Sequence, residues 1–217
     1  CSIRNKKKIQ IYFEELMLKF KKIKGNLVHT SSIINWDKIN IGKGNIIGPN
    51  VIIGTDAQHP YSESKGKIII GNNNIFREFT TIHLPTKTKE ITKIGNNCYF
   101  MTLSHIAHDC IIEDKVIFSN NVTLGGNTHV MKQSQLGFNT TVHQNQVIGS
   151  YTMIGMSSVI TKKIKIVPGY IYVGNPAKKI GINKVGIIKK KISNFNLKKE
   201  RLRFRSIIKN HPYYCYD

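Results

Sequence analysis

The chain carries an apolar residue at every sixth position from Ile94 to Ile166, without exception. An α-helix repeats every 3.6 residues and a β-strand every two, so neither element alone produces a period of six. Such a repeat is typical of a parallel β-helix, an all-β solenoid whose short strands wind into stacked triangular coils of about eighteen residues. Small residues often follow the apolar position, as at Gly95 and Gly125, where we expect a tight corner. The inward-facing residues are predicted to be Ile94, Phe100, Ile106, Ile112, Phe118, Leu124, Val130, Leu136, Val142, Ile148, Ile154, Ile160 and Ile166.

The repeat begins earlier and is interrupted twice. The same step is kept by Ile41, Ile47, Ile53, Ile70, Phe76 and Ile82. The step of six is broken between Ile53 and Ile70. Residues 55–67 in this interval are polar and include Pro60 and Gly66, which indicates a loop. A second loop is expected over residues 84–92, around Pro85. Loops that leave a rigid scaffold often carry ligand contacts, so both are candidate parts of a site.

Both ends of the chain depart from the repeat. Residues 5–24 show an apolar stripe at helical spacing, with lysines opposite, and predict an amphipathic helix that caps the open end of the solenoid. After Pro168 the hexads stop, and the basic stretch 187–209 predicts one or two short helices. The expected organisation is an N-terminal basic helix at 1–26, a β-helix at 27–181 and a basic, helical C-terminal tail at 182–217.

The composition is strongly basic, with 33 Lys and Arg against 12 Asp and Glu and a net charge of +21. Two explanations stay open: the codon bias of an AT-rich genome, or an anionic partner such as RNA, anionic lipid or an acidic protein.

The four cysteines include no CxxC pair, which argues against structural zinc and favours a reducing compartment. We expect no transmembrane segment, because no apolar run is long enough. The first residue is Cys1 rather than Met, which favours a processed or trimmed chain.

Histidines are concentrated in the repeat region, at His59, His83, His105, His108, His129 and His143. Three histidines can hold zinc, as in the β-helix carbonic anhydrases. Here their offsets from the core positions differ, so their side chains are expected on different sides of the coil. We therefore predict no metal site and no cofactor.

Five segments, in the order in which they occur, resemble the UDP-N-acetylglucosamine 3-O-acyltransferase family, which uses acyl carrier protein in the first step of lipid A synthesis. The resemblance covers about residues 27–187. It implies a left-handed β-helix and a homotrimer with active sites in the clefts between subunits. The segments are 75–83 (IFREFTTIH), 105–110 (HIAHDC), 120–126 (NNVTLGG), 142–144 (VHQ) and 174–177 (GNPA).

The family's chemistry needs a general base that deprotonates the sugar 3-hydroxyl for attack on the acyl thioester, and donors that stabilise the oxyanion. The resemblance places this base at the end of a Leu-small-Gly-His stretch, where this chain has Asn127. An amide cannot take up a proton near neutral pH. The tentative replacements are His129, two residues further on, and His143.

The resemblance also implies the substrate-binding residues. In the first loop, the family's Gln-Asp-x-Lys segment reads Gln58, His59, Pro60, Tyr61, so the carboxylate and the lysine are missing. Gly126 and Gln144 match the family. The family's helical C-terminal domain, which contributes nucleotide contacts, is expected to be shortened here.

Two functions follow. The first is an acyltransferase-like β-helix that has lost catalysis and acts as a trimeric scaffold or as a subunit of a larger assembly. The second is an active acyl carrier protein-dependent acyltransferase on a UDP-amino sugar, with a relocated histidine base. A zinc hydratase shares the expected fold but not the motifs. The compartment stays open between the mitochondrial matrix and the bacterial cytoplasm.

Overall fold

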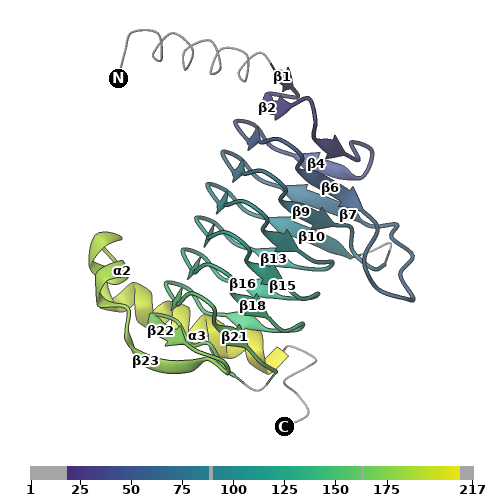
Figure 1. The fold of residues 1–217 in the computed structure, drawn as a ribbon. Coiled ribbons are helices and arrows are strands. Elements are labelled where there is room, and N and C mark those ends of the chain that lie inside the picture. The colour runs from purple at the N-terminus through teal and green to yellow at the C-terminus, as the bar shows by residue number, and fades with distance from the viewer. Residues whose placement is uncertain (1–18, 88–89, 163, 211–217) are drawn as a thin grey trace, which may run out of the picture.

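The computed structural model describes residues 19–87, 90–162 and 164–210, which form a parallel β-helix followed by two helices (Figure 1). The strands belong to three sheets that run along the stack of coils. Sheet A contains β1 (Phe20–Ile23), β2 (Asn26–His29), β5 (Ile46–Ile47), β8 (Ile75–Phe76), β11 (Tyr99–Phe100), β14 (Ile117–Phe118), β17 (Gln135–Leu136), β20 (Met153–Ile154), β22 (Tyr170–Val173) and β23 (Lys178–Ile182).

The other two sheets complete the triangular cross-section. Sheet B contains β3 (Ile33–Ile34), β6 (Ile52–Thr55), β9 (Thr81–His83), β12 (His105–Ile106), β15 (Thr123–Leu124), β18 (Thr141–Val142) and β21 (Val159–Ile160). Sheet C contains β4 (Ile39–Ile41), β7 (Lys67–Ile70), β10 (Ile91–Ile94), β13 (Ile111–Ile112), β16 (His129–Val130) and β19 (Val147–Ile148). Among the described strands, pairing is parallel except between β1 and β2 and between β22 and β23.

The hexad residues form the core, as the sequence predicts. Every hexad position from Ile94 to Ile166 is at most 2% exposed. The coils stack in register, so Ile106 pairs with Leu124, which pairs with Val142. Each apolar side chain is therefore covered by its counterparts in the coils on either side.

The glycines of the repeat have a different role from the one expected. Most of the left-handed corner positions are occupied by other residues, among them Asn127 and Asn145, with φ of 57° and 62°. Gly125 is needed because a Cβ there would lie 2.5 Å from the backbone N of Gln144 in the next coil. Close approach between coils, rather than an unusual φ, therefore excludes a side chain at this position.

Two loops interrupt the coils where the sequence predicts them. β6 ends at Thr55 and β7 begins at Lys67, and between them the chain projects from the side of the stack (Figure 1). β9 ends at His83 and β10 begins at Ile91. Both loops leave the solenoid after strands of sheet B, which brings them to the same side of the molecule.

The N-terminal helix prediction is wrong for its last residues. Phe20–Ile23 form β1, which pairs antiparallel with β2 through a turn at Lys24 and Gly25. A strand is favoured there because β2 would otherwise leave its outer backbone groups unpaired at the end of sheet A. Residues 5–18 of the predicted helix lie outside the described residues.

The C-terminal helices agree with the prediction. α2 spans Lys184–Lys189 and α3 spans Asn194–Asn210. α3 lies against the last coils (Figure 1), where its Phe204 packs on Met131 and Val147. No helix among the described residues is both long and apolar enough to cross a membrane.

Candidate functional site

Two clefts meet at the corner that follows β12, between sheets B and C. The first has a volume of about 570 Å³ and is lined by His59, Thr86, Lys87, Glu90, Ile91, His108, Asp109, Ile111 and Asn127. The second, about 480 Å³, is lined by Gln58, His105, Ala107, His108, Thr123, Leu124, Gly125, Gly126, Thr141, Val142, His143 and Gln144. His108 lines both clefts and is therefore at the centre of the site.

His108 is paired with the carboxylate that follows it in the sequence. Its Nδ1 lies 2.8 Å from Oδ2 of Asp109, and both side chains are largely buried. A carboxylate that accepts from Nδ1–H fixes the ring so that Nε2 carries the lone pair. Histidine oriented in this way is the usual form of a general base.

The second loop holds Asp109 in place. Thr86 donates its backbone N–H to Oδ1 (3.1 Å) and its hydroxyl to Oδ2 (2.9 Å) of Asp109. Burial acts to raise the pKa of Asp109, but hydrogen bonds from His108 and then Thr86 outweigh it and hold the pKa below its usual range. Asp109 is therefore a carboxylate at neutral pH, as a partner of His108 must be.

The ring of His108 packs tightly between neighbouring groups. It lies against Gly126, where an added Cβ would overlap the ring. The ring of His59, from the first loop, lies 5.6 Å from it in an edge-on arrangement. The first loop thus reaches the corner where the two clefts meet.

Two further histidines lie on sheet B beside the pair. The rings of His83 and His105 are 4.8 Å apart, and Nδ1 of His105 lies 2.7 Å from the Thr81 hydroxyl. Burial, followed by the nearby His105 and His108, lowers the pKa of His83 to about 4. Burial and His108 also lower the pKa of His105. Both rings are therefore neutral near pH 7. No set of three His, Cys, Asp or Glu side chains within the described residues is placed to hold a metal ion.

Most of the residues that the sequence analysis singled out lie around His108. Gln58, Gly126, His143 and Gln144 line the second cleft, and His59 and Asn127 line the first. Tyr61 is 89% exposed and contacts the ring of His59.

Asn127 and His143 differ from His108 in their partners. Asn127 is an exposed corner residue whose Nδ2 donates to Oδ1 of Asn145 in the next coil at 2.7 Å. His143 is also exposed, and its Nδ1 lies 2.9 Å from the carbonyl oxygen of Gln144. Neither has a carboxylate partner of the kind that orients His108.

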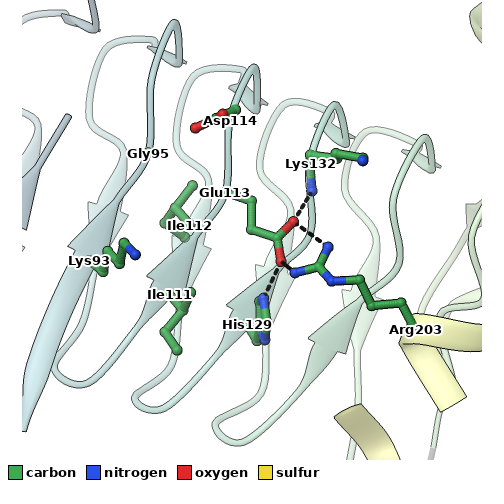
Figure 2. A pocket seen from close by; sticks show the side chains of 9 residues that line it. All are labelled: Lys93, Gly95, Ile111, Ile112, Glu113, Asp114, His129, Lys132 and Arg203. Carbon is green, nitrogen blue, oxygen red and sulfur yellow. Dashed lines mark hydrogen bonds and ion pairs between the residues drawn. The ribbon is translucent and has the colours of Figure 1, made fainter. Parts of the chain in front are cut away.

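His129, the first candidate replacement for the base, lies away from His108. It lines a separate cleft of about 270 Å³ on sheet C, where its Nε2 lies 2.6 Å from Oε1 of Glu113 (Figure 2). Arg203 of α3 binds both carboxylate oxygens of Glu113, with Nη1 2.8 Å from Oε2. Two residues are the period of a strand, so the sequence suggests that Asn127 and His129 face the same way. In the structure Asn127 lies at a corner, and His129 follows it on sheet C.

The Glu113 network predicts a loss of stability in acid. Burial acts to raise the pKa of Glu113, but hydrogen bonds from His129 and Arg203 lower it to about 2. Because the folded-state pKa lies below the ordinary value of 4.5, the contribution is complete above pH 4.5 and is lost as the pH falls through about 2. Linkage limits it to about 3 kcal/mol, and solvent screening of the 41%-exposed Arg203 reduces this.

Urea unfolding at pH 5 and at pH 2.5 measures this effect. We expect the free energy of unfolding to fall less for Glu113→Gln than for the wild type over this interval, because the amide cannot be protonated. An equal fall in both proteins would show that the network does not contribute.

The pairing of His108 with Asp109 was not predicted from the sequence. The signal was present, because His-Asp is part of the HIAHDC segment that carries the resemblance. A histidine next to an aspartate in sequence is common, and only the corner geometry turns the two side chains toward each other. The role of Thr86 could not be read from the sequence, since 23 positions separate it from Asp109.

Residues 91–126 match the family of bacterial transferase hexapeptides (six repeats). Together with the coil geometry, this match places the chain among the hexapeptide-repeat β-helix proteins. Among curated relatives, the acyl-(acyl-carrier-protein)–UDP-N-acetylglucosamine O-acyltransferase of Gloeothece citriformis is 32% identical over 172 residues, which is 79% of this chain and 62% of the relative. That of Synechocystis is 33% identical over 80% of this chain and 63% of the relative. The chain thus spans less than two thirds of the length of these relatives.

Solved structures point to the same family. The UDP-N-acetylglucosamine acyltransferase from Bacteroides fragilis superposes with a TM-score of 0.74 at 29% identity, over 84% of this chain and 71% of that one. The Acinetobacter baumannii LpxA superposes with a TM-score of 0.61 at 31% identity, over 84% of this chain and 82% of that one. The chain belongs to the UDP-N-acetylglucosamine acyltransferase family, and membership implies the left-handed coil that the resemblance predicts.

Proposed function

We propose that this protein transfers an acyl group from the thioester of an acyl carrier protein to a hydroxyl of a UDP-amino sugar, with His108 as general base. The observation that carries the proposal is the His108–Asp109 pair at the corner where two clefts meet. The relatives' names supply the substrate class. The geometry supplies a base that does not depend on Asn127.

The residues of the corner account for each step of such a transfer. Nε2 of His108 takes the proton from the sugar hydroxyl, whose oxygen attacks the thioester carbonyl carbon. Gly126 lies against the ring of His108, and its backbone N–H is our candidate donor to the oxyanion. When the tetrahedral intermediate collapses, the carbon–sulfur bond breaks and the protonated His108 returns its proton to the leaving thiolate. Asp109 keeps the ring oriented throughout.

Substrate binding would be divided between the clefts. Gln58 and Gln144, which match the family, line the second cleft together with His143 and are proposed to contact the substrate. In the first loop His59 and Tyr61 replace a carboxylate and a lysine, so recognition of the sugar is expected to differ from that of the relatives.

A second candidate is a non-catalytic scaffold. One observation in its favour is Asn127, which stands in place of the family's histidine and is hydrogen-bonded to Asn145. The other is the pair of changes at His59 and Tyr61 in the first loop. In that case the protein serves as a structural subunit of a larger assembly, with the mitochondrial matrix or the bacterial cytoplasm as its compartment. For both candidates we propose side-by-side association through the flat sheet faces, as a homotrimer or a hetero-assembly.

The consumption of acyl carrier protein thioester in the presence of UDP-N-acetylglucosamine separates the two candidates. Turnover that needs both substrates supports the enzyme. No turnover with a panel of acyl lengths and UDP-amino sugars, from protein whose mass by light scattering is that of a trimer, supports the scaffold.

A further inference from the structure

A further pocket, apart from the clefts described above, lies between α3 and the last coil. It has a volume of about 320 Å³, at the lower end of the range for small-molecule sites. It shares no lining residue with the two clefts around His108. Its lining residues are Lys165, Val167, Arg201, Phe204, Arg205, Ile208 and Lys209.

The lining combines an apolar floor with a cationic rim. Val167, Phe204 and Ile208 are wholly or partly buried and belong to the cluster by which α3 packs on the solenoid. The remaining lining side chains are those of Lys and Arg, and none of the described Asp or Glu residues lines the pocket. Apolar surface beside several like charges is unfavourable for an empty site and suits a ligand that is apolar at one end and anionic at the other.

One of the cations is held in place. Arg201 donates from Nε to the carbonyl oxygen of Pro168 (3.3 Å), and its guanidinium lies 4.9 Å from the ring centroid of Tyr170. A guanidinium that is already oriented loses less conformational freedom when it binds a carboxylate or phosphate. Lys165 and Arg205 are exposed and form no ion pair with any of the described residues.

Acidic residues are scarce in the part of the sequence that forms the pocket. Between residues 115 and 210 the sequence has 17 Lys and Arg but a single acidic residue, Glu200. Glu200 is 3% exposed, and its carboxylate is bound by Lys132 (2.8 Å) and the Ser150 hydroxyl (2.6 Å). Glu200 is therefore already engaged, and among the described residues it is not a partner of Lys165 or Arg205.

We propose that this pocket binds an anionic amphiphile, with a phosphate or carboxylate head between Arg201, Arg205 and Lys165 and an alkyl chain on Val167, Phe204 and Ile208. Such a ligand replaces water on the apolar floor and places a negative charge beside Arg201, Arg205 and Lys165. The site is independent of acyl transfer at His108. Its ligand is either a lipid within a membrane or a soluble single-chain amphiphile, because the two share this chemistry.

Isothermal titration with octyl phosphate below its micelle concentration tests the proposal. Octyl glucoside keeps the chain without the charge, and inorganic phosphate keeps the charge without the chain. We expect both to bind about tenfold more weakly than octyl phosphate or not at all, since each lacks one half of the interaction. Binding of octyl phosphate that is no tighter than that of phosphate would overturn the proposal.

A pair of matched double variants locates the binding. Lys165→Gln with Arg205→Gln is expected to weaken octyl phosphate binding about tenfold or more. Lys184→Gln with Lys199→Gln removes the same charge from exposed positions outside the pocket and should leave the affinity unchanged. Equal losses in both would indicate non-specific attraction by a basic surface and overturn the proposal. All four side chains are on the surface, and unfolding curves of the variants check that the fold is intact.

Sedimentation with lipid vesicles identifies the source of the ligand. Binding to phosphatidylglycerol vesicles but not to phosphatidylcholine vesicles, lost in Lys165→Gln/Arg205→Gln and kept in Lys184→Gln/Lys199→Gln, indicates a membrane lipid. Octyl phosphate binding without vesicle binding indicates a soluble amphiphile. Both results support the pocket, whereas binding to neither ligand excludes it.

Discussion

Replacing His108 with alanine is expected to lower the rate of acyl transfer by about 10²–10⁴-fold, the usual contribution of a general base. The ring is largely buried in the wall of the two clefts but does not belong to the apolar core of the coils, so its loss should leave the coils intact. Asp109→Asn is expected to reduce the rate less severely, because the ring remains but its Nδ1 no longer faces a carboxylate. Thioester consumption under saturating substrate measures both effects.

His129→Ala provides the matched control for this prediction. His129 is a histidine of the same solenoid that is bonded to Glu113, in a different cleft. Its removal should change acid stability and leave the rate close to that of the wild type. If His129→Ala abolished turnover and His108→Ala did not, the assignment of His108 as the base would be wrong, and the alternative drawn from the sequence, with His129 as a relocated base, would be correct.

The fold could be predicted from the sequence because its information is local and repeated. A buried residue at every sixth position fixes the coil length, the inward face and the stacking register together. Each hexad position carries the same signal, so one ambiguous residue does not change the result. The ends of the solenoid have no such redundancy, and there Phe20–Ile23 follow the unpaired edge of β2 rather than their helical pattern.

The candidate site was predicted in its surroundings but not at its centre. The resemblance brought Gln58, Gly126, His143 and Gln144 to attention, and they line one cleft. It placed the position of the base at Asn127, one coil after His108. Asn127 donates its backbone N–H to the carbonyl oxygen of His108 at 2.9 Å, so the two positions are neighbours in space.

Contacts between the solenoid and α3 could not be predicted from the pattern. Arg203 binds Glu113 across 90 positions of sequence, and Glu200 binds Ser150 across 50. In the sequence, Arg203 is one of several Lys and Arg residues in the basic stretch 187–209, and nothing distinguishes it from the others. Only the docking of α3 on the last coils separates the arginine that closes an ion pair from those that line an open pocket.

Phe100→Ala is expected to destabilise the protein by about 3–5 kcal/mol, the cost of truncating a fully buried phenylalanine. Phe100 is 0% exposed and lies between two other rings of the core, 5.1 Å from Phe76 and 5.2 Å from Phe118. The backbone hydrogen bonds of three sheets fix the spacing of the coils, so the cavity cannot close by moving one coil toward the next. We expect a loss near the upper end of that range.

Phe138→Ala makes the same chemical change at a corner where the side chain is 47% exposed. Its cost should be within about 0.5–1 kcal/mol, because little apolar surface returns to water. Urea unfolding followed by circular dichroism measures both variants, and the slope of the transition shows whether they unfold in the same manner as the wild type. Similar losses for the two substitutions would mean that the stacked rings inside the coils are not the main source of stability in this solenoid.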